Sequence, residues 1–457
     1  MKTDGLILGP SVAAVVAAVL LGLGLGPGAA LVGALTSLCA VWWTLEPIPI
    51  AATSLLPFVV LPMAGLLDRS QVSGAFGHPL ILLLMGGFLL STVMERSGAH
   101  EQLALRVVRA FGATRGPRAV LGFMVACALV SMWISNTATV LMLLPVAAAV
   151  VQRSSAPERL AAPLFLGLAW SANIGGMGTP VGTPPNALLL AELHAQGLPW
   201  GFAEFLRVGG PVVVLMVPMA WLWLCRGGRL AGIEVTPPVA RPWSAPEVRA
   251  LALFGLTIVL WVSRTAPFGG WSAALGLQQV GDHTVALAMV VLAFLLPSGD
   301  GSRLLDWPTA VRIPWGLLLL FAGGIALGSG FRTSGLDVAL GDALAQLAAL
   351  PLPATVFVLA LVVTFATEVL SNTATAALLM PILSAAAVGA GEPAAAWLMP
   401  AGLSASCAFM LPVSTAPNAI VVGAGHVPPR VMVREGLAMN LLGAVLITAT
   451  TVWLLPG

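Results

Sequence analysis

Long stretches without a charged side chain constrain this chain more than any other feature. Residues 119–152 form a run of 34 positions with no charge, and similar runs recur along the 457-residue chain. Only 8% of all residues are charged, whereas soluble domains carry about 25%. Because about 20 apolar residues suffice to cross a bilayer as a helix, the sequence predicts an all-α polytopic membrane protein.

The composition also excludes several classes of protein. A net charge of +2 provides no basic surface for nucleic acid. The solid apolar runs do not alternate as the strands of a transmembrane β-barrel would. The four cysteines stand singly, without a CxxC motif. The expected spans contain no catalytic dyad or metal cluster, which disfavours an intramembrane enzyme.

We expect about eleven transmembrane helices. Two of them lie within residues 5–45 and are separated by a glycine-rich turn at 22–28. Further spans are expected at 47–67, 70–94, 208–225, 247–265, 283–298, 313–331 and 436–456. Residues 160–191 and 393–427 are apolar runs interrupted by Gly-, Pro- and Asn-rich links. We interpret each as two half-helices joined by unwound backbone.

Two runs have the wrong length for a single span. One helix over residues 119–152 would rise about 50 Å, far beyond a hydrocarbon core of about 30 Å. Its centre is the polar sequence SNTAT at 135–139, and residues 353–384 repeat this arrangement around SNTAT at 371–375. We therefore predict two re-entrant helical hairpins, whose tips must face protein or a water-filled cavity.

These features form an internal repeat. The SNTAT motifs are 236 residues apart, and the PNA sequence at 185–187 recurs at 417–419. Counting eleven spans from a cytoplasmic N-terminus places 16 of the 20 basic residues in the cytoplasm and the C-terminus outside. The two hairpins then open from opposite sides, an inverted-topology repeat typical of secondary transporters.

The polar tips are suited to binding both an anion and a cation. Half-helix N-termini present N–H groups to anions, and hydroxyl, amide and carbonyl oxygens suit hard cations such as Na⁺. Ser and Thr in membrane helices also serve as simple interhelical hydrogen bonders, but two matching copies beside broken helices favour a binding site. Glu368 is either a proton site or a structural hydrogen-bonding group.

The four elements expected to form the site carry no Lys or Arg. They are residues 119–152, 160–191, 353–391 and 393–427, and Glu368 is their only carboxylate. A dianion bound there would meet no fixed positive side chain, and an isolated buried charge is very costly. We therefore expect mobile Na⁺, more than one per dianion, to supply the compensating charge.

The two SNTAT motifs, GTPPNA at 182–187, its partial echo STAPNA at 414–419 and LEPIP at 45–49 closely resemble the divalent-anion/sodium symporter family over nearly the whole chain. The resemblance implies a homodimer in a bacterial-type inner membrane. It implies an elevator-type movement of a transport domain (residues 119–226 and 353–457) against scaffold helices (1–118 and 227–352). The expected function is Na⁺-coupled import of a C4-dicarboxylate such as succinate or malate. An exchanger or a sulfate or citrate carrier is the alternative.

The resemblance also implies roles for individual residues. The substrate-binding residues would be Ser135, Asn136, Thr137, Thr183, Ser371, Asn372, Thr373 and Thr415. The first Na⁺ site would use Ser131, Ser135, Asn136 and the Gly182 carbonyl. The second would use Thr367, the Leu370 carbonyl, Asn372 and the Ser414 carbonyl. This chain has Ala416 where the family usually has a second proline in that link.

Overall fold

The computed structural model describes residues 2–265, 269–299, 301–344 and 350–455, and the regular structure of these residues is helical. Nine helical segments within them are long and apolar enough to cross a membrane, and four shorter apolar helices accompany them. An all-α membrane protein is therefore confirmed, while the total of eleven spans stays a prediction.

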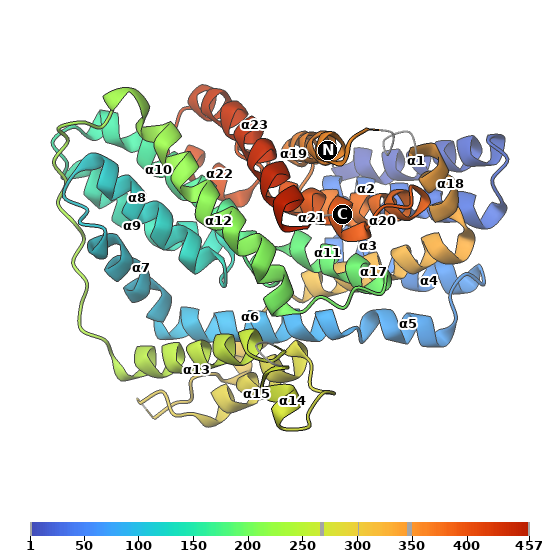
Figure 1. Cartoon of the computed structure of the whole chain (residues 1–457), viewed down its shortest axis with the longest axis horizontal. Coiled ribbons are helices and arrows are strands. Elements are labelled where there is room, and N and C mark those ends of the chain that lie inside the picture. Colours follow the sequence, from blue (N-terminus) through green and yellow to red (C-terminus); the bar gives the residue numbers. More distant parts are fainter. Residues whose placement is uncertain (1, 266–268, 300, 345–349, 456–457) are drawn as a thin grey trace.

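The first part of the chain forms one end of the molecule and then runs lengthwise along it (Figure 1). Its helices are α1 (Lys2–Gly22), α2 (Pro27–Leu45), α3 (Ile50–Thr53), α4 (Leu56–Met63), α5 (Arg69–Phe76), α6 (Pro79–Ser97) and α7 (Ala99–Ala110). The break between α1 and α2 lies in the predicted glycine-rich turn.

The span expected over residues 47–67 is interrupted. The chain forms the two short helices α3 and α4 there, of 4 and 8 residues, within one apolar segment over Ile50–Met63. Proline at position 57 leaves no backbone N–H to continue the helix across Ser54 and Leu55. The Ser54 hydroxyl donates to the carbonyl of Ile50 and accepts the indole N–H of Trp43, each within 3.0 Å. The Trp43 side chain of α2 thus stabilises the break between α3 and α4.

The next helices contain the first hairpin and the first broken helix. They are α8 (Gly116–Ser131), α9 (Asn136–Gln152), α10 (Pro157–Gly176), α11 (Pro184–Ala195) and α12 (Phe202–Cys225). The connecting region of the second half comprises α13 (Ala245–Val262), α14 (Gly270–Ala274), α15 (Asp282–Leu295), α16 (Trp307–Ala310), α17 (Trp315–Ser334) and α18 (Leu336–Leu344).

The second hairpin and second broken helix complete the fold. They are formed by α19 (Leu352–Val369), α20 (Asn372–Gly389), α21 (Ala394–Ser404) and α22 (Ala416–Gly423), followed by the long last helix α23 (Pro429–Leu454). Helix α11 packs against α20 and α21, and α22 packs against α9 and α10. Each broken helix therefore contacts elements of the other half of the chain.

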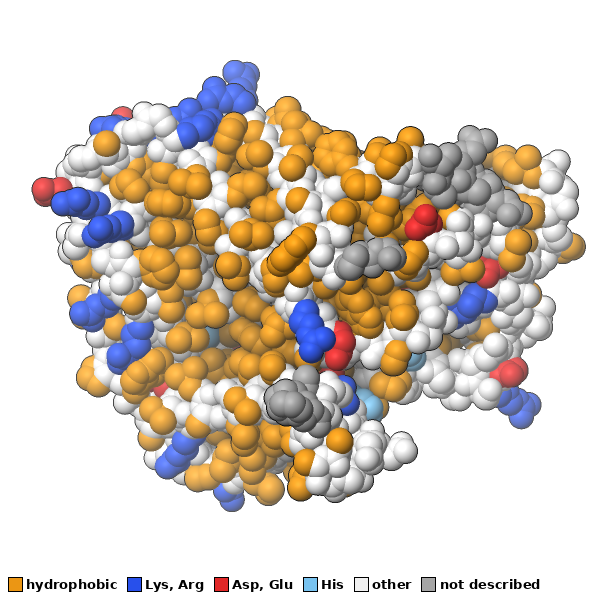
Figure 2. Space-filling view, viewed as in Figure 1, with side chains coloured by type: hydrophobic (Ala, Val, Ile, Leu, Met, Phe, Trp, Pro, Cys, Tyr) orange, Lys and Arg blue, Asp and Glu red, His pale blue; other side chains and the backbone are white. Residues whose placement is uncertain are grey.

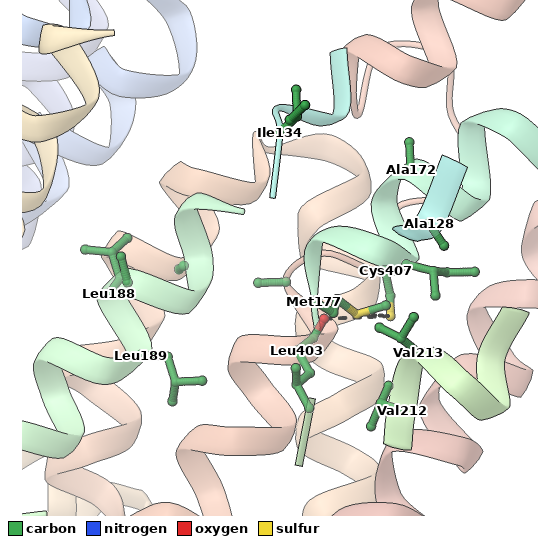
Figure 3. Packing of buried hydrophobic residues seen from close by; sticks show 14 of the residues in the cluster. Ala128, Ile134, Ala172, Met177, Leu188, Leu189, Val212, Val213, Leu403 and Cys407 are labelled. Atoms are coloured by element: carbon green, nitrogen blue, oxygen red, sulfur yellow. Dashed lines mark hydrogen bonds between the residues drawn. The ribbon is translucent and has the colours of Figure 1, made fainter. Parts of the chain in front are cut away.

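The two unwound links, between α10 and α11 and between α21 and α22, pack against each other in the core together with the end of α10. Trp170 and Asn173 of α10 are fully buried. The Trp170 indole donates to the Phe409 carbonyl at 3.1 Å, and the Asn173 amide donates to the Ala408 carbonyl at 3.1 Å. Figure 3 shows Met177 and Cys407 beside each other among buried aliphatic side chains, with their sulfur atoms 3.9 Å apart. This contact joins the two halves directly behind the hairpin tips.

Candidate functional site

A cavity of about 500 Å³ lies where the two hairpin tips and the two links meet. A volume of this size is typical of small-molecule sites. Most residues of the predicted site line it. These are Ser135, Asn136, Thr137, Gly182, Thr183, Asn372, Thr373, Ser414 and Thr415. Ser131, Thr367, Leu370 and Ser371 are not part of the lining. The residues brought together come from both halves of the chain.

Four helices begin at this cavity. Helices α9 and α20 start at Asn136 and Asn372, and each is capped by the preceding serine, whose hydroxyl accepts a backbone N–H at 3.2 Å. Helices α11 and α22 start directly after Thr183 and Thr415. Because a helix N-terminus carries a partial positive charge, the four together favour an anion in this cavity.

Each hairpin tip contains an oxygen-rich corner. The Ser131 hydroxyl lies 2.7 Å from Asn136 Oδ1 and 2.8 Å from the Ala172 carbonyl oxygen. A hydroxyl has one proton to donate. The Ser131 hydroxyl can therefore hydrogen-bond to only one of these two oxygens, and the other short contact joins two oxygen atoms without a proton between them. Three neutral oxygens gathered in this way suit a hard cation such as Na⁺.

The second tip repeats this corner. The Thr367 hydroxyl lies 2.8 Å from Asn372 Oδ1 and 2.9 Å from the Ala405 carbonyl oxygen. The carbonyls of Ala172 and Ala405 were not among the predicted ligands, because they lie in α10 and at the end of α21, which neither hairpin motif marks. Among the described residues no group of three or more His, Cys, Asp or Glu could hold a metal ion. A cation at either corner would therefore meet neutral oxygens.

The asparagines of the two PNA sequences shape the links. The Asn186 amide donates to the carbonyls of Gly176 and Thr179 at 2.9 and 2.7 Å. The Asn418 amide donates to the carbonyls of Ala408 and Leu411, both at 3.0 Å. Each amide thus folds the unwound segment back onto the start of the following half-helix. The repeat of this motif was visible in the sequence, but its structural role was not.

Three asparagine oxygens near the links have no hydrogen-bond donor among the described residues. They are Oδ1 of Asn173, Asn186 and Asn418, and all three are buried. Asn173 also lines the cavity and donates to Thr415 Oγ1 at 3.2 Å. Because buried acceptors are costly when unpaired, these oxygens fit a site that receives cations or water.

Glu368 lies behind the second tip and holds the second link. Its carboxylate accepts the backbone N–H groups of Phe409, Met410 and Leu411, each at 2.8 Å, and the side-chain amide of Asn440 at 2.8 Å. The side chain is almost completely buried. Of the two hypotheses for this residue, these contacts favour the structural hydrogen-bonding group. The equivalent position of the first repeat is Met132, so the first link has no such anchor.

Two charged side chains from outside the four elements also line the cavity. They are Arg312, in the segment that leads into α17, and Glu95, near the end of α6. The expectation that a bound dianion meets no fixed positive charge therefore holds for the four elements but not for the whole cavity. An ion pair of 2.7 Å between Arg96 and Asp306 ties the Arg312 segment to the end of α6. No spacing in the sequence places Arg312 beside the hairpin tips.

Comparisons with known proteins agree on the family. The family model described as "Citrate transporter" (CitMHS) matches residues 40–402. The chain is 34% identical to the "Sodium-dependent dicarboxylate transporter SdcS" of Staphylococcus saprophyticus over 99% of this chain and 91% of that protein. It is also 34% identical to the protein of the same name from Staphylococcus aureus, over 93% of this chain and 85% of the relative.

A solved structure supports the fold alone. The Alcanivorax borkumensis YdaH transporter, described as having an unusual topology, superposes with a TM-score of 0.59 at 16% identity. The match covers 84% of this chain and 89% of that one. Since the family model matches most of the chain and the relatives align over nearly all of it, the chain belongs to the citrate-transporter family, and the resemblance to the divalent-anion/sodium symporters is confirmed.

Proposed function

We propose that this protein is a secondary transporter that imports a small dianion, a C4-dicarboxylate such as succinate or malate, together with Na⁺. The observation that carries the proposal is the convergence of four helix N-termini and two neutral polar tips on one cavity. The dicarboxylate and sodium in the names of the staphylococcal relatives agree with it.

The substrate would lie between the two tips. One carboxylate would bind the hydroxyls and amide of Ser135, Asn136 and Thr137. The other would bind Ser371, Asn372 and Thr373. The hydroxyls of Thr183 and Thr415 would complete the site from the links. Hydroxyls, amides and backbone N–H groups donate to sulfate as readily as to carboxylates, so selection among dianions depends on the spacing of the two tips.

Two Na⁺ ions would occupy the oxygen-rich corners. The first would be held by Ser131, Ser135, Asn136 and the Gly182 carbonyl, joined by the Ala172 carbonyl of that corner. The second would be held by Thr367, the Leu370 carbonyl, Asn372 and the Ser414 carbonyl, joined by the Ala405 carbonyl. Each asparagine then contributes its oxygen to the cation and its NH₂ group to the anion. Sharing one amide between both ligands couples the binding of Na⁺ to the binding of the dianion.

The movement and assembly follow the family resemblance. We propose a homodimer in a bacterial inner membrane, with the N-terminus in the cytoplasm and the C-terminus outside. Residues 119–226 and 353–457 would form the transport domain, and residues 1–118 and 227–352 the scaffold. Residues 1, 266–268, 300, 345–349 and 456–457 of these ranges lie outside the described part of the chain. The cavity would be carried across the membrane by an elevator movement.

Uptake by purified protein in proteoliposomes tests this proposal. Radiolabelled succinate, malate, citrate and sulfate are supplied with an inward Na⁺ gradient, or with choline in place of Na⁺. We expect succinate or malate uptake that requires Na⁺, and inhibition of that uptake by the unlabelled C4-dicarboxylates. Full-rate uptake in choline driven by internal dicarboxylate would instead establish an exchanger, and uptake of sulfate or citrate alone would overturn the substrate assignment.

A further inference from the structure

A second cavity, remote from the anion site, lies between α10, α12 and α23. It measures about 300 Å³, and its charged lining residues are Arg159, Arg229 and Glu435. Its remaining wall is apolar and includes Leu166, Leu224 and Val431. The proposed transport function uses none of these residues. The cavity therefore combines a cationic mouth with an apolar interior.

The arginines at this cavity outnumber the one carboxylate that they surround. Glu435 is almost completely buried and accepts Arg226 at 2.5 Å, Arg434 at 3.0 Å and Arg229 at 3.4 Å. The Arg159 guanidinium is held beside them, because it donates to the Arg229 carbonyl at 2.7 Å. Three arginines thus pair with one carboxylate and a fourth lies beside them, and the side chains of Arg229 and Arg434 remain 45% and 74% exposed.

Exposed apolar side chains lie on the two helices that line the cavity, α12 and α23. Leu437, Leu441 and Val445 of α23 are exposed at intervals of four residues, which places them on one face of the helix. Leu222 of α12 is exposed as well. Figure 2 shows basic side chains gathered at the edge of the molecule where α12 ends and α23 begins, next to a wide apolar surface.

We propose that this cavity binds an anionic phospholipid. The headgroup phosphate would lie between Arg159 and Arg229, and an acyl chain would follow the exposed apolar face of α23. An excess positive charge at the ends of membrane helices is the feature that recognises anionic headgroups. An apolar wall beside it distinguishes a lipid from a free anion. The predicted orientation places this mouth at the cytoplasmic leaflet.

The experiment measures lipid retained by full-length protein. The protein is reconstituted in nanodiscs of phosphatidylglycerol and phosphatidylcholine, re-extracted in detergent, washed, and its bound lipid is quantified by mass spectrometry. We expect phosphatidylglycerol enriched above its bulk fraction. The Arg159→Gln/Arg229→Gln variant should bind about thirtyfold more weakly, since each basic residue near an anionic headgroup changes binding by roughly fivefold.

Two further variants separate the possible outcomes. Arg153→Gln removes an exposed arginine outside the cavity and should retain the enrichment. Ala162→Trp fills the cavity while keeping every arginine, so it should lose the lipid even if the double variant does not fold. Enrichment that survives in Ala162→Trp, or that disappears equally in Arg153→Gln, would overturn the proposal. Displacement of phosphatidylglycerol by millimolar inorganic phosphate would identify a soluble-anion site instead.

Discussion

Replacing Glu368 by glutamine tests how the second link is held. The glutamine oxygen can keep the three bonds that Glu368 Oε1 receives from Phe409, Met410 and Asn440. The new NH₂ group then faces the Leu411 N–H, which at present donates to Oε2 at 2.8 Å. One acceptor becomes a donor, so the Leu411 N–H loses its partner in a buried environment.

The size of this effect follows from the number of bonds. A hydrogen bond to a charged group contributes about 1.5–3 kcal/mol, and an unpaired buried donor costs about 1–3 kcal/mol. The three remaining bonds also weaken, because the glutamine oxygen is neutral. We therefore expect Glu368→Gln to lower the free energy of unfolding by about 3–5 kcal/mol in total. The link also carries Ser414 and Thr415, which line the cavity. Na⁺-dependent uptake should therefore fall together with the stability.

Thermal unfolding in detergent and uptake in proteoliposomes are measured on the same preparations. Glu392→Gln, on the connection between α20 and α21, is the control and should leave both unchanged. If Glu368 were instead a proton site, Glu368→Gln would unfold at the wild-type temperature and change the dependence of uptake on pH. A wild-type unfolding midpoint with wild-type uptake would refute the reasoning altogether.

Three other predictions concern the cavity and the topology. Asn136→Ala and Asn372→Ala should each abolish uptake of dianion while the protein remains folded, because each removes an oxygen from a cation corner and an amide from the anion site; near-normal uptake by either would contradict the site. Arg312→Gln should raise the apparent KM for the dianion severalfold when the dianion enters from the side of the membrane that Arg312 faces. The difference between variant and wild type should shrink in high salt, which screens exposed charges. Equal KM values for the two proteins at low salt would exclude a role of Arg312 in binding. In a background without native cysteines, Thr114→Cys should react with an impermeant thiol reagent only from the cytoplasm and Gln278→Cys only from outside. Labelling of both from one side would reject the predicted orientation.

Much of the architecture could be predicted because a bilayer imposes lengths on the sequence. A run too long for one span and too short for two, with a polar centre, allowed few solutions, and α8 and α9 meet at Ser135 as expected. Helices α19 and α20 likewise meet at Ser371, but each is long and apolar enough to cross a membrane, so the second hairpin's re-entrant form stays a prediction. The break between α3 and α4 was missed because a charge-free run reveals hydrophobicity but not where a helix stops.

The parts of the site that were missed depend on contacts between distant segments. The backbone partners of Glu368 lie about 40 residues further along the chain and Asn440 lies 72 residues further, and no periodicity connects them. Arg312 belongs to a segment that looked like an ordinary loop before a span, yet it lines the cavity. The carbonyl oxygens of Ala172 and Ala405 were missed for the same reason, since they lie about 40 residues from the hydroxyls that they meet.

The contact between the two links has a consequence for synthesis of the protein. Asn173 is fully buried and donates to Ala408, which follows it by 235 residues. At about 5–20 residues per second, a ribosome needs on the order of 10–50 s to produce that partner. During this interval the Asn173 amide and the Trp170 indole lack the partners that they have in the folded protein. Insertion of the first half therefore has to shelter these groups, by water or by the translocation machinery, until the second half arrives.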